Sequence, residues 1–173
     1  MIGYSREAQV NFQVGDPVVY PPQGGGVVQE IVERTVLGEK QQYLKVVFVR
    51  GNMEVLVPLA KAMQVGLRRT MSAEEATRLA QQAEQDLDLP EQWPPRFRAE
   101  QEILARSDAF ELSRLIGTLT RRDEERGLAS TERDVLDNAR ALLASELAIV
   151  HDTTFEASER WIEESLLGAG QAS

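Results

Sequence analysis

The stretch YLKVVFVRGNMEVLV, residues 43–57, predicts a β-hairpin and decides the fold class of the first part of the chain. Residues 43–49 and 53–57 are rich in valine and other residues that favour strands, and a short glycine-containing loop, Arg50-Gly51-Asn52, separates them. Pro58 cannot donate a ladder hydrogen bond, so we expect the second strand to end there. The spacing predicts two antiparallel neighbours in a small sheet.

Two more β-rich segments lie upstream of this hairpin. Residues 16–20 (DPVVY) begin the sheet, and residues 27–36 form a long extended run that ends near Gly38. We expect Gly24-Gly25-Gly26, between these segments, to form a tight turn, because glycine accepts positive φ. A phosphate-binding loop is disfavoured because the Gly-Lys-Ser/Thr sequence and a following helix are missing. Four or five short strands favour a small barrel of SH3 or Tudor type, with a β-sandwich fragment as the alternative.

From residue 71 onward the apolar residues follow the period of helices. Ser72-Ala73-Glu74-Glu75 is a capping box that should open a helix reaching to about Leu87. Later starts are predicted at Trp93-Pro94-Pro95, Ser107-Asp108, Ser130-Thr131 and a second capping box, Thr153-Thr154-Phe155-Glu156, and a C-terminal cap is predicted at Gly127. Five helices with short loops suit a bundle. The predicted class is α+β, with a β domain over residues 1–70 and a helical domain over residues 71–173.

Charge separates the two parts of the chain. Residues 1–70 hold eight Lys/Arg and six Asp/Glu, a net charge of +2, whereas residues 71–173 hold eleven Arg and twenty-two Asp/Glu, a net charge of −11. An acidic helical domain argues against nonspecific coating of nucleic acid. Any DNA contact in this part must therefore be local and directed by geometry.

The composition also disfavours several classes of chemistry. The chain has no cysteine and a single histidine, His151, which leaves little material for a metal site or a histidine-based triad. The carboxylates lie on helices with regular apolar stripes, where a solvated face is favoured over an acid/base pair. The sequence contains no run of about 18 apolar residues, so no membrane helix is predicted. A cytoplasmic location is expected. We therefore expect neither an enzyme nor a cofactor.

Trp93 stands outside any helical stripe, between an acidic linker and a double proline, and Arg96, Phe97 and Arg98 follow it. An apolar wedge flanked by arginines suits distortion of a DNA minor groove, in which the cations hold the backbone while the ring presses on a base step. A helix start also offers free backbone N–H groups to a phosphate. The alternative is a tryptophan that anchors the loop onto the bundle. Composition leaves both interpretations open.

Several motifs, in a fixed order, resemble the CarD/CdnL family of bacterial RNA polymerase-binding transcription regulators. They are VGDPVVYPPQGGGV (14–27), GEKQQYL (38–44), VP (57–58), VGLR (65–68), WPPRFR (93–98), RRDEERGL (121–128) and ARALL (139–143). The similarity covers roughly residues 11–165. It implies a Tudor-like N-terminal domain that binds the polymerase β subunit and is similar to the polymerase-interacting domain of transcription-repair coupling factors.

The same resemblance implies that the helical domain touches promoter DNA at the upstream edge of the transcription bubble. There Trp93 would be the minor-groove wedge that stabilises the open complex. The predicted backbone contacts are Arg96 and Arg98, with Arg122 and Arg133 as further basic positions.

On the polymerase side, Arg34 matches a position that contacts the β subunit. Some relatives carry an arginine where this chain has Leu56. We expect an edge strand at Val55, Leu56 and Val57 that can pair with a strand of the partner through main-chain hydrogen bonds. The expected partners are therefore polymerase and promoter DNA, with no membrane and no small-molecule substrate. An adaptor of the transcription machinery without DNA contact is the alternative.

Overall fold

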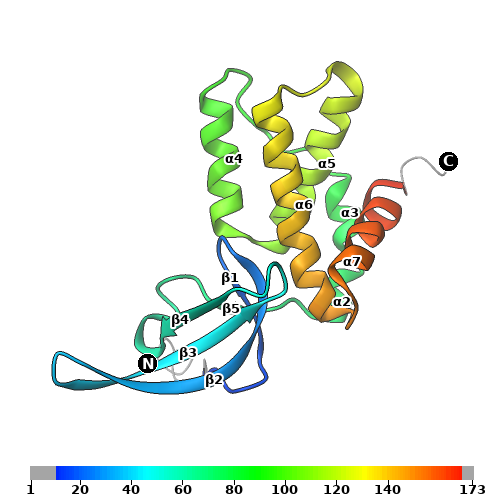
Figure 1. Ribbon diagram of the computed structural model, residues 1–173. Coiled ribbons are helices and arrows are strands. Elements are labelled where there is room, and N and C mark those ends of the chain that lie inside the picture. Colours follow the sequence, from blue (N-terminus) through cyan, green and yellow to red (C-terminus); the bar gives the residue numbers. More distant parts are fainter. Residues whose placement is uncertain (1–10, 169–173) are drawn as a thin grey trace, which may run out of the picture.

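The computed structural model describes residues 11–168 and consists of an antiparallel sheet followed by a helical bundle (Figure 1). The strands are β1(Pro17–Tyr20), β2(Gly24–Val36), β3(Glu39–Phe48), β4(Glu54–Pro58) and β5(Arg68–Arg69), with the 3-10 helix η1(Leu59–Lys61) before β5. The helices are α2(Ala73–Ala76), α3(Leu79–Ala83), α4(Pro95–Arg106), α5(Ala109–Arg126), α6(Ser130–Val150), α7(Phe155–Trp161) and the π-helical segment η2(Ile162–Leu167). The α+β prediction is confirmed. Residues 1–10 and 169–173, which the two domain assignments include, lie outside the described range.

The five strands follow the order β4-β3-β2-β1-β5, so β4 lies at one edge. The predicted hairpin is confirmed, because β3 and β4 pair antiparallel with Val46 opposite Val55. Alternate side chains of the strands face a small core, which includes Val18, Val28, Leu44, Val46, Phe48 and Val57. The far part of the β2–β3 hairpin extends away from this core and from the bundle (Figure 1). No helix in residues 11–168 is long and apolar enough to cross a membrane.

The prediction that Gly24-Gly25-Gly26 forms a turn is wrong, because all three glycines belong to β2 and the turn lies just before them. Of the three, only Gly24 has a positive φ, 100°. A Cβ at Gly25 would lie 2.6 Å from the carbonyl oxygen of Ser145, on α6. The Gly25 N–H donates to Ser145 Oγ at 2.8 Å. The glycines are therefore needed where the strand meets a helix 120 residues further along the chain.

Of the predicted helix starts, those of α2 and α5 have the expected side-chain cap, whereas α4 and α6 begin without one. Ser72 and Glu75 form the predicted capping box, and Asp108 caps α5 by accepting the Glu111 N–H. The predicted length of the first helix is wrong, because the helix breaks after Ala76 and its second part ends at Ala83 instead of about Leu87. At the break, the Thr77 hydroxyl donates to the Glu74 carbonyl oxygen at 2.5 Å, a local bond that competes with continuation of the helix.

The start of α7 also differs from the prediction. The N-cap of α7 is Thr154, which accepts the Ala157 N–H, so no glutamate completes the second predicted capping box. Gly127 is the C-cap of α5 with φ 75°, as predicted. The helices enclose a second core, separate from that of the sheet, built largely from α5 and α6.

Arg68 and Glu146 join the sheet to the bundle. Arg68 on β5 donates to both carboxylate oxygens of Glu146 on α6, at 2.8 and 3.0 Å. Its second terminal nitrogen also donates to the Ser107 carbonyl oxygen at 2.6 Å. The Met71 N–H donates to Glu146 at 2.6 Å. Together with the Gly25–Ser145 contact, these bonds hold the C-terminal half of α6 against the sheet (Figure 1).

Candidate functional site

Trp93 lies in the loop before α4, at the end of the bundle that points away from the sheet (Figure 1). Its side chain is 42% exposed. The ring packs against Phe97, one helical turn further on, with 5.0 Å between centroids. Phe97 in turn packs against the bundle core. The ring is therefore packed against the bundle and still partly exposed, so both the anchor and the exposed-ring interpretations describe part of it.

Arg96 does not extend to solvent as a phosphate contact should. Its side chain is 12% exposed, and it binds Glu132 on α6 through Nε at 2.8 Å and Nη2 at 3.2 Å. Its Nη1 donates to the Glu91 carbonyl oxygen at 2.5 Å, and its guanidinium carbon lies 5.1 Å from the Trp93 ring centroid. Arg96 thus ties the Trp93 loop to α6, and its predicted contact with a phosphate stays a prediction.

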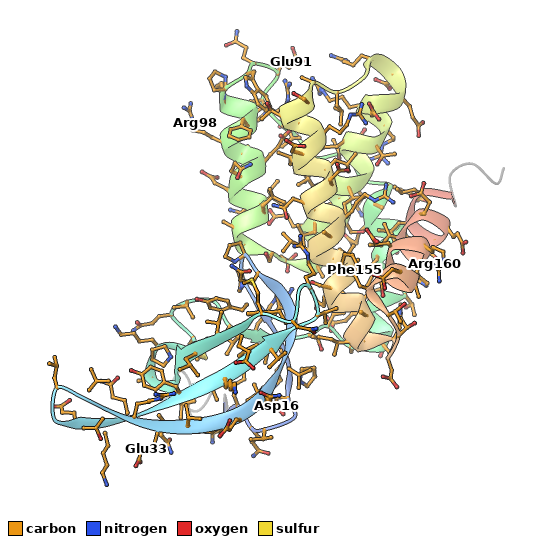
Figure 2. The ribbon with its side chains drawn as sticks, viewed as in Figure 1. Asp16, Glu33, Glu91, Arg98, Phe155 and Arg160 are labelled. Atoms are coloured by element: carbon orange, nitrogen blue, oxygen red, sulfur yellow. The ribbon has the colours of Figure 1, made fainter. Side chains whose placement is uncertain are left out.

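The other three predicted cations lie around the same end of the bundle, where α4 begins, α5 ends and α6 begins. Arg98 is exposed and points outward from α4 (Figure 2). Arg122 on α5 is 23% exposed, with its Nε 3.9 Å from Glu132. Arg133 on α6 is half-exposed and pairs with Asp123 at 2.8 Å. The structure therefore brings Trp93, Arg96 and Arg122 together through Glu132, while Arg98 and Arg133 flank this group.

Two buried glutamates beside Trp93 were missed by the sequence analysis. Glu100 on α4 is fully buried and Glu132 on α6 is nearly so. Burial, followed by the contact with Glu132, raises the pKa of Glu100 to about 8. Burial alone would raise the pKa of Glu132 as well, but hydrogen bonds from Glu100 and Arg96 outweigh it and lower that pKa. The missed signal is that Glu100 shares the apolar stripe of Ile103 and Leu104.

The predicted polymerase-side residues lie on the sheet, and the structure places two of them together. Arg34 on β2 and Leu56 on β4 line one shallow hollow, together with Glu30, Val32, Lys45 and Glu54. Leu56 is 40% exposed, whereas the side chain of Val57 is buried and that of Val55 is half-buried. Among the strands of residues 11–168, β4 pairs only with β3, so the main chain of residues 55–57 forms the edge that was predicted.

Comparison with known proteins gives two family matches that together span nearly the whole described chain. The model of the CarD-like/TRCF RID domain matches residues 12–71, and that of the CarD C-terminal domain matches residues 71–163. A Bacillus subtilis (strain 168) protein named "Putative transcription factor YdeB" is 31% identical over 146 residues, covering 83% of this chain and 94% of that protein.

Proposed function

The chain belongs to the CarD family of transcription regulators, and from this premise we propose that it stabilises the promoter open complex by pressing Trp93 into the minor groove at the upstream bubble edge. The family assigns it a role in transcription regulation through interaction with RNA polymerase. In this proposal, residues 1–70 bind the polymerase β subunit and residues 71–173 contact DNA. The observation that carries the proposal is the half-exposed ring of Trp93, which packs against Phe97.

A supported ring suits a wedge because little conformational freedom is lost when it meets DNA. Phe97 and Arg96 both pack against the ring, and the exposed part of the indole is left for a base step. Unstacking a base step of a closed duplex costs a few kcal/mol, whereas inserting the ring at a junction that is already melted costs much less. Binding would therefore favour the open state, and a preference of about 1.4 kcal/mol shifts the equilibrium about tenfold.

The exposure of each arginine indicates how well it can contact the phosphates of DNA. Arg98 and Arg133 are the best placed to meet the DNA backbone, and Arg122 contributes from its half-buried position. Arg96 serves the site indirectly, by holding the Trp93 loop. The helical domain as a whole is acidic and would bind DNA weakly alone, so docking on polymerase must supply local concentration.

On the polymerase side, the β4 edge and the hollow containing Arg34 and Leu56 form one continuous surface. A partner strand can pair with the main chain of Val55, Leu56 and Val57, which makes the affinity depend little on the side chain at position 56. Arg34 then adds a directed charge contact. Because Arg68 and Glu146 hold the bundle to the sheet, polymerase docking also fixes where the Trp93 end can reach.

The main test is Trp93→Ala in a full transcription complex. We expect binding to polymerase to be unchanged and the lifetime of the open complex at a responsive promoter to fall several-fold, measured by competitor challenge. Trp161→Phe is the control, since it alters the other tryptophan, on α7, and should leave the lifetime unchanged. An open-complex lifetime equal to that of the wild type in Trp93→Ala would contradict the wedge.

The polymerase surface is tested by Arg34→Glu. We expect weaker binding to the isolated β-subunit lobe, measured by calorimetry. Lys40→Glu is the control and makes the same change of charge. Lys40 is next to Gln41, the strand partner of Arg34, so the Lys40 side chain points to the opposite face of the hairpin. Equal affinity for the wild type and Arg34→Glu would remove Arg34 from the contact surface.

A second candidate function is an adaptor of the transcription machinery without DNA contact. The net charge of −11 in residues 71–173 and the packing of Trp93 on Phe97 favour it. A photocrosslinker placed at residue 93 separates the two candidates. Crosslinks to upstream promoter DNA support the wedge, whereas crosslinks to protein alone support the adaptor.

A further inference from the structure

Glu100 and Glu132 are two buried carboxyl groups that both lie near Arg96, and only Glu132 is hydrogen-bonded to it. Glu132 receives both bonds from Arg96, at 2.8 and 3.2 Å. Glu100 lies 3.8 Å from Arg96 Nε, and neither of its oxygens accepts a hydrogen bond from any donor in residues 11–168. Burying a second, unpaired charge at this point would be costly.

Glu100 and Glu132 can share a hydrogen bond only when one of them carries a proton. Arg96 neutralises Glu132, and Arg122 on α5 adds a second positive charge 3.9 Å from the same carboxylate. The proton therefore belongs on Glu100, which then donates to Glu132. The charged groups facing Glu100 are Arg96 on its own helix, Glu132 on α6 and Arg122 on α5, and their arrangement agrees with the raised pKa of Glu100.

Arg96 connects this carboxyl pair to the Trp93 ring. The same guanidinium that binds Glu132 lies over the indole at 5.1 Å and bonds the Glu91 carbonyl oxygen in the Trp93 loop. Figure 2 shows Glu91 at the end of the bundle that points away from the sheet. Any change that draws Arg96 from Glu132 toward Glu100 must therefore also move the support of the ring.

We propose that Glu100 is a positioning residue for Trp93: it shares one proton with Glu132, and this proton keeps Arg96 in the orientation that supports the ring. Loss of the proton gives Arg96 two competing carboxylates and shifts the indole. It also removes the single net positive charge that Arg96, Arg122 and Glu132 carry together beside Trp93. The consequence for DNA rests on the proposed function, whereas the effect on the ring does not.

The test uses the full-length free protein and follows the indole N–H resonances of both tryptophans by NMR from pH 6 to pH 10. We expect the Trp93 resonance to titrate with a midpoint at about 8 and the Trp161 resonance, on α7, to serve as the reference. Glu100→Gln mimics the protonated acid, so Trp93 should stay at its low-pH position throughout. Glu102→Gln, an exposed change on the same helix, should titrate like the wild type.

The proposal is overturned if the wild-type Trp93 resonance does not move across this range, or if Glu100→Gln titrates as the wild type does. A direct carboxyl titration of Glu100 in 13C-glutamate-labelled wild type covers the case in which Glu100→Gln fails to fold. A Glu100 midpoint near the ordinary value for glutamate would overturn the proposal.

A second arm compares open-complex lifetimes with wild type and Glu100→Gln at pH 7 and pH 9, so that the pH response of polymerase itself cancels in the ratio. We expect equal lifetimes at pH 7 and a several-fold longer lifetime with Glu100→Gln at pH 9. If Trp93 titrates as expected in the free protein but the lifetimes match at both pH values, the positioning role stands and the DNA wedge fails.

Discussion

Glu146, at the junction with the sheet, and Glu100, near the opposite end of the bundle, are both buried glutamates, but only Glu146 has partners for its carboxylate. Glu146 accepts two bonds from Arg68 and one from the Met71 N–H. Glu100 accepts none from residues 11–168 and has another glutamate beside it. The first arrangement joins the sheet to the bundle through direct hydrogen bonds. The second is sensitive to protonation, and it lies beside the residue proposed to touch DNA.

The largest effect should come from breaking the satisfied site with Glu146→Leu. The change leaves the partly buried Arg68 and the Met71 N–H without their acceptor, and removing one partner of a buried pair costs about 3–5 kcal/mol. We expect a loss near the lower end of that range, because the Arg68 side chain is 31% exposed. Denaturant unfolding measures it, and Asp137→Leu, an exposed change on the same helix, should cost far less. Equal losses would show that the junction does not depend on Glu146.

An effect of opposite sign is expected from Glu100→Gln. The pKa of Glu100 is raised to about 8 in the folded protein, so the folded state binds more protons than the unfolded state between the ordinary glutamate pKa and about 8. Wild-type stability should therefore fall as pH rises through this window, by at most about 1.4 kcal/mol per pH unit. Glu100→Gln should remove this slope and be more stable than wild type at neutral pH.

Unfolding free energies measured at several pH values between 5 and 9 test this slope, with Glu102→Gln as the matched control. Parallel pH profiles for the wild type and Glu100→Gln would mean that Glu100 is ionised in the folded protein. In that case the contrast with Glu146 would disappear.

Features that depend on near neighbours in the chain could be predicted from the sequence. The capping box at Ser72 and Glu75, the cap at Asp108 and the glycine stop at Gly127 each involve residues within one turn of the helix end. The β3–β4 hairpin followed from residue preferences on either side of a short loop. Local hydrogen bonding and backbone conformation decide all of these features, so a single sequence contains the necessary information.

Features that depend on distant partners could not be predicted in this way. Gly25 resembles a turn residue until Ser145 is placed against it, and Arg96 resembles a free cation until Glu132, 36 residues away, takes up its donors. The exposure of Trp93 likewise depends on how α4 packs against the bundle. Glu146, like Glu100, lies among apolar neighbours on its helix, with Leu142, Leu143 and Val150 one turn away, but no local pattern identifies Arg68 as its partner. The candidate site could therefore be located from the sequence, whereas assigning roles to its charged residues required the packed structure.

The smallest effect is expected at a third carboxylate, Asp123, which extends the comparison to the surface. A hydrogen bond from Arg133 lowers the pKa of Asp123, and one from the Leu128 N–H adds to this effect. Because the pKa of Asp123 is lower in the folded protein, its ionised form stabilises the fold at pH values above the ordinary pKa of aspartate. This stabilisation is lost as the pH falls through the lower pKa of the folded state. Because this pair is exposed and screened by solvent and salt, Arg133→Ala should leave the free energy of unfolding at neutral pH without measurable change.

The same variant should raise the pKa of Asp123 toward the ordinary aspartate value but not fully to it, because the Leu128 N–H remains in place. An NMR titration of the Asp123 carboxyl carbon measures this shift, and Arg126→Ala, a nearby exposed change at the end of α5, is the matched control. A clear loss of stability in Arg133→Ala would place this surface pair in the same class as Arg68–Glu146. Burial would then not be the property that separates the three carboxylates.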